Sequence, residues 1–243
     1  MRLLAMDTAT SAISVAVHDG ERVLASRSVV DARRHTELLS PMLVEALDAA
    51  GTTPQEVTHV AVGTGPGPFT GLRVGIVTAR TFAHARGLAT YGVCSLDALA
   101  AAAAERGHAG DLLVATDARR KEVYWARYRC GAGAFVALDE PGVCKPADLP
   151  GDVRSLPTLG RGPLLYPDLL PNGSDLLDVD AAALADVAAV RITAGVDMPV
   201  EPLYLRRPDA LAPAPPKSSL APPRQQQRPR RRSAPAGREE ADQ

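Results

Sequence analysis

Two aspartates in this sequence stand where a carboxylate could help to hold a metal-bound phosphate. Asp7 and Asp117 each end a short apolar run. Carboxylate oxygens suit Mg²⁺, although aspartate at the end of a strand is also an ordinary turn residue. The turns after them contain no glycine through which the backbone could approach a triphosphate. We therefore favour a structural role for Asp7 and Asp117 as turn residues.

A stretch rich in glycine and proline is the second place where a ligand could bind. It contains Gly63, Gly65, Gly67 and Gly71, follows a strand-like run and precedes a helical pattern. This arrangement lets backbone N–H groups approach an anion or another backbone closely. No Lys-Ser/Thr follows the last glycine, and Pro68 breaks the dinucleotide-binding pattern. The stretch therefore resembles a hinge for the next helix more than a phosphate cradle.

The sequence lacks the residue patterns of hydrolases and of metal-dependent enzymes. It has no GxSxG or HExxH motif, and no two histidines lie within one helical turn of each other. Its three cysteines show no CxxC spacing, so neither a disulfide framework nor a zinc site is indicated. The histidines of the chain are His18, His35, His59, His84 and His108, and its cysteines are Cys94, Cys130 and Cys144.

The composition describes a chain of 243 residues, 46% hydrophobic, with a net charge of -1. That balance indicates neither a nucleic-acid nor a membrane partner. We find no signal sequence and no membrane-length apolar run, so a cytoplasmic location is expected. From residue 211 onward, seven basic residues face three acidic ones in a segment rich in proline, arginine and glutamine. We predict that 209–243 is disordered.

Short apolar strands and amphipathic helices must position these residues. The chain opens with three strands, and Asp19-Gly20 predicts a tight hairpin turn between the last two. The first helix begins either at Ser40 or near Thr36, because Pro41 is compatible with both. The expected strands lie at about 2–6, 13–17, 22–30, 57–62 and 88–93, and the helices at about 36–50, 70–86 and 95–105, the last capped by Ser95.

The second predicted helix is apolar on more than one side. One side carries Leu72, Ile76, Ala79, Phe82 and Ala83, and another carries Val74, Val77, Thr81 and Ala85. Gly75, Ala79 and Ala83 form a stripe of small side chains that permits close approach of another helix. Packing inside the same chain and packing against another subunit both explain this stripe.

The opening pattern then recurs. An apolar strand ends at Asp117, and alternating strands follow at about 123–128 and 135–138. After Pro141 the signal weakens, except that Asp180 is a good N-cap for a helix at 181–193. The repeat predicts an internal duplication and an α/β fold of two lobes, 1–107 and 108–208. Its plan resembles the actin-like ATPase and sugar kinase superfamily, which has a ribonuclease H-like fold of mixed sheets flanked by helices. This resemblance implies that Asp7, Thr8 and Asp117 are degenerate phosphate-loop positions.

Four motifs resemble the bacterial TsaB (YeaZ) family over about residues 2–208. They appear in the family's order and spacing, and the glycine–proline motif is long and specific. Pro68 stands where the family usually has serine, and the basic tail has no counterpart in the resemblance. The motifs are Met6–Thr10, His35–Leu39, Gly65–Gly75 and Asp117–Tyr124.

The resemblance implies a non-catalytic relative of TsaD, the enzyme that transfers threonylcarbamoyl to N6 of adenosine 37 in tRNAs reading ANN codons. It implies a heterodimer with a TsaD-type transferase, a TsaE-type ATPase in the same assembly, and tRNA contact through the complex. ATP and metal would be used by the partner proteins, with no cofactor required by this chain. The alternative is a nucleotide-dependent phosphotransferase or ATPase of the same superfamily.

The resemblance also implies that the N-terminal lobe binds the partner. We expect the helices at 36–50 and 70–86 to pack against matching helices of the transferase, and the same surface could form a homodimer when the chain is alone. The predicted partner-binding residues are His35, Leu38, Leu39, Met42, Leu43, Phe69, Leu72, Gly75, Ile76, Ala79 and Ala83.

Overall fold

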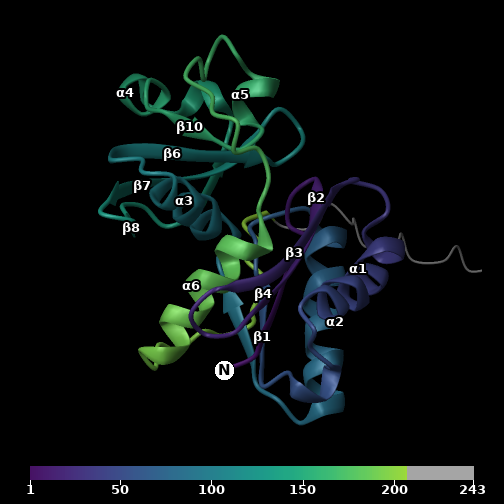
Figure 1. The fold of residues 1–243 in the computed structure, drawn as a ribbon. Helices are drawn as coiled ribbons and strands as arrows, with labels where there is room; N and C mark the ends of the chain where they lie inside the picture. Colours follow the sequence, from purple (N-terminus) through teal and green to yellow (C-terminus); the bar gives the residue numbers. More distant parts are fainter. Residues whose placement is uncertain (207–243) are drawn as a thin grey trace, which may run out of the picture. The chain divides into compact units, whose positions relative to one another are not determined.

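The structure, a computed structural model, describes residues 1–206 (Figure 1). Met1–Arg207 cluster as one compact unit that contains two β-sheets. The segment 209–243, predicted to be disordered, lies outside the described residues.

The first sheet has the strand order β3-β2-β1-β4-β5. Strands β1, β2 and β3 are antiparallel neighbours, as the sequence predicts, whereas β4 and β5 extend the sheet in parallel. Gly20, with φ of 106°, supplies the left-handed residue of the β2–β3 turn. The strands are β1 (Leu3–Asp7), β2 (Ala12–His18), β3 (Val23–Val30), β4 (His59–Gly63) and β5 (Thr90–Val93).

The second sheet repeats this plan in shorter form. Strands β6, β7 and β8 are antiparallel, and β10 pairs in parallel with β6 as β4 does with β1. The predicted duplication is therefore present in the topology, although residue identity between the halves is weak. The strands are β6 (Gly110–Asp117), β7 (Val123–Gly131), β8 (Ala134–Ala137), β9 (Gly142–Cys144), which also pairs with β7, and β10 (Thr158–Leu159).

The helices begin and end close to the predicted positions. Helix α1 starts at His35 and contains Pro41, so the start near Thr36 is correct and the start at Ser40 is wrong. Ser95 does not cap α3, because its side chain binds elsewhere. The helices are α1 (His35–Ala49), α2 (Phe69–Arg86), α3 (Ser95–Glu105), α4 (Gly151–Arg154), α5 (Gly162–Leu165) and α6 (Ala181–Thr193), with short 3-10 turns η1 (Pro54–Glu56) and η2 (Pro146–Asp148).

Side chains of each strand point alternately to the two faces of the first sheet, so the core has a separate layer on each face. Leu4 and Met6 face α1 and α2, whereas Leu3 and Ala5 face α3 and α6. The second sheet packs one face against α3 and the other against the segment that holds α4 and α5. Helices α3 and α6 therefore lie between the two sheets (Figure 1).

Helix α6 returns to the first sheet although it follows the second sheet in sequence. The Asp180 side chain accepts a hydrogen bond from Ala182 N, which confirms the predicted N-cap. Gly20 N donates to His18 Nδ1 at 2.8 Å, so His18 Nε2 carries the proton that it donates to Asp186 at 3.0 Å. The carboxyl group of Glu105 on α3 also lies in hydrogen-bonding contact with that of Asp186. One carboxylate thus joins β2, α6 and α3.

Replacing Glu105 with glutamine tests this junction. Partial burial and the neighbouring Asp186 carboxylate raise the pKa of Glu105. A group whose pKa is raised on folding contributes stability at acid pH that is lost as the pH rises through the raised value. Glutamine donates its hydrogen bond at every pH. We expect the unfolding free energy of Glu105→Gln to fall less than that of the wild type between mildly acid and neutral pH, measured by urea denaturation.

The matched control is Glu45→Gln on the exposed side of α1. It should reproduce the wild-type profile. Superimposable profiles for Glu105→Gln and the wild type would contradict the assignment of Glu105 to this hydrogen bond.

Candidate functional site

Asp7 is completely buried and bonded within the chain. Its Oδ1 accepts a hydrogen bond from Ala9 N at 2.8 Å, and its Oδ2 accepts one from Ser95 Oγ at 2.6 Å. Ser95 Oγ in turn accepts from Gly65 N at 3.1 Å. Burial raises the pKa of Asp7, and these hydrogen bonds offset only part of that effect. The carboxylate therefore joins β1 to the glycine-rich stretch and to α3, and is 0% exposed to any ligand.

The glycine-rich stretch packs against the turn after Asp7. A Cβ at Gly75 would lie 2.5 Å from Thr8 Oγ1, and a Cβ at Gly71 would lie 2.5 Å from Thr8 O. A Cβ at Gly63 would overlap the Asp7 carboxylate. The Thr8 hydroxyl donates to Gly71 O at 2.7 Å and accepts from Gly75 N at 3.1 Å. Because these glycines have no side chains, the turn at Asp7 and Thr8 can pack directly against them.

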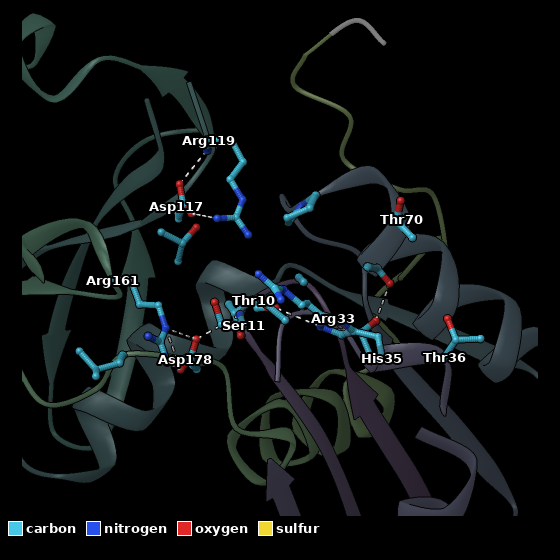
Figure 2. Close-up of a pocket in the computed structure, with 17 residues that line it drawn as sticks. Thr10, Ser11, Arg33, His35, Thr36, Thr70, Asp117, Arg119, Arg161 and Asp178 are labelled. Atoms are coloured by element: carbon cyan, nitrogen blue, oxygen red, sulfur yellow. Dashed lines mark hydrogen bonds and ion pairs between the residues drawn. The ribbon is translucent and has the colours of Figure 1, made fainter. Parts of the chain in front are cut away.

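Asp117 lies at a separate place, on a cleft between the two sheets (Figure 2). Its Oδ1 accepts a hydrogen bond from Arg119 N at 2.7 Å, and its Oδ2 pairs with Arg119 Nη1 at 2.9 Å. Thr8 lines the same cleft, but its hydroxyl is already engaged with α2. Both aspartates thus have partners within the chain, and Asp117 alone of the two lines the cleft.

Most of the predicted partner-binding side chains lie inside the chain. Gly75, Ala79 and Ala83 are buried, and the two alanines pack in the same core as Val60 and Val62 of β4. Packing within the chain is therefore the correct interpretation of the small-residue stripe. The other predicted residues that are buried in the chain are Leu39, Met42, Leu43, Leu72 and Ile76, with Leu38 partly buried.

His35 and Phe69 differ from that buried group. His35 lines the cleft, and its Nε2 lies 3.2 Å from Thr10 O. Phe69 is 48% exposed at the start of α2, where its ring lies 5.3 Å from that of Tyr204 and 4.9 Å from the guanidinium carbon of Arg73. Phe69 is thus the one predicted residue with a large exposed apolar surface among those described.

The outward sides of α1 and α2 carry further apolar side chains. Val44 and Val77 are 59% and 57% exposed. Val77 continues the series Phe69, Arg73 along one side of α2, at helical spacing of four residues. A groove of about 490 Å³ runs between the two helices and is lined in part by Phe69, Val74 and Val77. The sequence signal for this side was the second apolar face of α2.

Residues 1–206 contain neither a metal-binding cluster nor a membrane-spanning helix. No group of three or more His, Cys, Asp or Glu side chains there could hold a metal ion. No helix there is long and apolar enough to cross a membrane.

Comparison with known proteins identifies the family of this sequence. The family model for TsaD, described as tRNA N6-adenosine threonylcarbamoyltransferase, matches residues 26–155. The tRNA threonylcarbamoyladenosine biosynthesis protein TsaB of Escherichia coli is 34% identical over 225 residues, which cover 85% of this chain and 95% of that protein. This chain belongs to the TsaB (YeaZ) family.

Structures and further relatives agree with this membership. YeaZ from Pseudomonas aeruginosa has the same fold, with a TM-score of 0.74, 31% identity, and coverage of 84% of this chain and 99% of that one. The predicted α/β fold of two sheets flanked by helices is confirmed. An uncharacterized protein of Mycobacterium leprae is 43% identical over 213 residues, or 86% of this chain, which spans 55% of that longer protein.

Substitution of Asp7 tests its structural role. Asp7→Ala leaves two buried donors, Ala9 N and Ser95 Oγ, without their acceptor. We expect the unfolding free energy to fall by about 3 kcal/mol, because each unsatisfied buried donor costs on the order of 1–3 kcal/mol. The control is Asp48→Ala on the exposed side of α1, which should change stability little. Equal stabilities of the two variants in urea would show that the Asp7 network is unimportant for folding.

Gly75→Ala tests the contact with Thr8. Alanine is favoured over glycine inside a helix by about 1 kcal/mol, so a position with free space would be stabilised. We expect a loss of about 1–3 kcal/mol instead, because the added Cβ overpacks the site. In a Thr8→Ala background the cost should shrink, which a double-mutant cycle measures by thermal denaturation. Stabilisation by Gly75→Ala in the wild-type background would refute the contact.

Proposed function

We propose that this chain is a non-catalytic subunit of a tRNA threonylcarbamoyladenosine synthesis complex, acting by pairing with a TsaD-type transferase. The TsaB names of its relatives support the role in this tRNA modification. The observation that carries the pairing is the exposed apolar side of α1 and α2, marked by Val44, Phe69 and Val77.

The buried state of Asp7 supports a non-catalytic role. In an active phosphotransferase of this fold, the corresponding carboxylate must reach the metal and phosphate. Here both oxygens are bonded to Ala9 N and Ser95 Oγ, and the side chain is 0% exposed. Freeing Asp7 would leave those donors unsatisfied in the core. This cost disfavours the alternative phosphotransferase or ATPase function.

The docking surface that we propose is the α1–α2 side, with the groove of about 490 Å³ between the helices. The family model that matches this chain is that of TsaD itself, so a TsaD-type partner would share the fold and present related helices. Similar surfaces pair readily about a twofold axis. Burial of Val44, Phe69 and Val77 would supply the apolar centre of the interface, and Arg73 its polar edge.

Several further assignments belong to this proposal. A TsaE-type ATPase would join the assembly, tRNA would be contacted through the complex, and the same α1–α2 side would form a homodimer when the chain is alone. ATP and metal would be used by the partner proteins, with no cofactor required by this chain. The location would be the cytoplasm, where tRNA is modified.

Val77→Asp tests the docking surface. A carboxylate buried without a partner in an apolar interface is strongly unfavourable, whereas Val77 is 57% exposed in the free chain. We expect the dissociation constant for the TsaD-type transferase to rise at least tenfold, equivalent to about 1.4 kcal/mol, with the melting temperature of the free chain unchanged. Calorimetry measures binding, and a reconstituted reaction measures modification of adenosine 37.

The matched control is Val190→Asp on α6, a valine that is 70% exposed and lies away from α1 and α2. It should bind and support modification as the wild type does. Wild-type affinity in Val77→Asp would exclude this surface. Full modification of adenosine 37 without this chain would contradict the proposed function itself.

A further inference from the structure

A groove of about 360 Å³ lies between strand β8 and helices α3 and α6. Phe135 and Ala137 of β8 line one side of it, Ala101 of α3 and Val187 of α6 line the other, and most of its lining is apolar. Its volume is within the roughly 300–1,000 Å³ that ligand pockets have. We call it the β8 groove. It shares no lining residue with the cleft or with the groove between α1 and α2.

Strand β8 forms an edge of the second sheet (Figure 1). Native proteins usually place charged residues or proline on edge strands, which prevents pairing with another chain. The four residues of β8 are Ala-Phe-Val-Ala and include neither. Val136 is 64% exposed at this edge. The strand is therefore open to pairing with an added strand.

The backbone groups of Phe135 and Ala137 point away from β7. Residue pairs along antiparallel strands alternate between hydrogen-bonded and non-bonded pairs. Leu138 N donates to Arg127 O at 2.9 Å, so this pair is bonded. By the same register Ala137 belongs to a non-bonded pair, and so does Phe135 two residues earlier. Their N–H and C=O groups are thus directed to the free edge, on two residues that line the β8 groove.

Two carboxyl groups give the β8 groove a negative charge. Glu105 and Asp186 both line it and lie in hydrogen-bonding contact with each other. Arg191 lines it as well, but Arg191 Nη2 lies 2.7 Å from Asp97 Oδ2, so this positive charge is already balanced. The charges that remain for a ligand are those of the two carboxyl groups.

These carboxyl groups favour a cationic ligand. Burial raises the pKa of both, and repulsion from Asp186 adds to the rise at Glu105. Two neighbouring carboxylates disfavour each other's ionisation, whereas a nearby positive charge favours it. A guanidinium or ammonium group beside the pair would relieve the repulsion. The β8 groove thus combines apolar walls, a free strand edge and a position suited to a cation.

We propose that the β8 groove binds an extended peptide of a partner protein, which adds a strand to β8 and places a basic side chain beside Glu105 and Asp186. The outward N–H and C=O groups of Phe135 and Ala137 would pair with the peptide backbone, as in other cases of strand addition. Apolar side chains of the peptide would cover the apolar walls. The basic side chain would supply specificity through charge-assisted hydrogen bonds.

This site uses neither α1 nor α2. A peptide in the β8 groove would therefore leave the proposed docking surface for the transferase free, and both partners could bind at once. The proposal is independent of the role in tRNA modification.

The test is fluorescence anisotropy of the full chain with a labelled peptide in which valine and threonine alternate around one central arginine. A reference peptide carries citrulline instead, which keeps the shape of arginine and removes its charge. We expect the arginine peptide to bind about tenfold more tightly than the citrulline peptide. In hydrogen exchange, the bound arginine peptide should slow amide exchange in 134–138.

Glu105→Gln tests the contribution of charge. It removes one carboxylate of the β8 groove and should abolish most of the preference for arginine over citrulline. The matched control is Glu140→Gln, which removes an exposed carboxylate that does not line the groove and should keep the preference.

Ala137→Pro tests the strand edge. Proline removes the outward N–H without removing a bond to β7, and proline is tolerated at such edge positions. We expect both peptides to bind about tenfold more weakly. The control Ala137→Ser keeps the N–H and should bind as the wild type does. If Ala137→Pro does not fold, the comparison of Glu105→Gln with Glu140→Gln decides.

Three results would overturn the proposal. They are equal binding of the two peptides by the wild type, equal preference for arginine in Glu105→Gln and Glu140→Gln, and unchanged binding by folded Ala137→Pro. Protection of 134–138 that rises with protein concentration in the absence of peptide would instead assign the edge to a second copy of this chain, and would also overturn it. The measurements use neither the transferase nor tRNA, so they decide this proposal separately from the proposed function.

Discussion

The close fit between the turn after β1 and the start of α2 is the constraint on which the first half of the structure depends. Asp7 and Thr8 saturate their hydrogen bonds with Ser95, Ala9, Gly71 and Gly75, and glycines leave the room for this contact. One small cluster thereby fixes the positions of β1, α2 and α3. The Asp7 carboxylate is buried and serves to hold these elements together.

This use of Asp7 has a functional counterpart on the outer surface. With the apolar inner sides of α1 and α2 consumed by the core, the outward sides retain Val44, Phe69 and Val77. A buried, fully bonded Asp7 together with an exposed apolar helical surface fits the proposed pairing with another protein. The same physical fact, a fully engaged interior, supports both halves of the proposed function.

The sequence was sufficient for the strands and long helices before Pro141, for α6 and for the duplication, because these follow from local periodicity and turn residues. It did not predict the short elements β9, α4, β10 and α5. It was not sufficient to decide which side of a helix faces the core or which distant group a side chain contacts. The stripe at Gly75 looked equally suited to a partner or to the core, and only the position of Thr8 decides between them. Ser95 stands at the start of a helical pattern and was therefore predicted to be a helix cap. Its actual partner, Asp7, is 88 residues away in the sequence and could not be found from the local pattern. The side chains that line the cleft, among them His35 and Asp117, come from segments far apart in the sequence, so no local pattern could bring them together.

The return of α6 has a consequence for synthesis. The strands of the first sheet are complete at Val93, yet the face that carries Leu3 and Ala5 is covered by a helix at 181–193. A chain emerging from the ribosome must therefore keep this apolar face open while the entire second sheet is made. This face is covered only when α6 has been synthesised and has packed on it. Truncated or stalled nascent chains would therefore expose it and would be targets for chaperones.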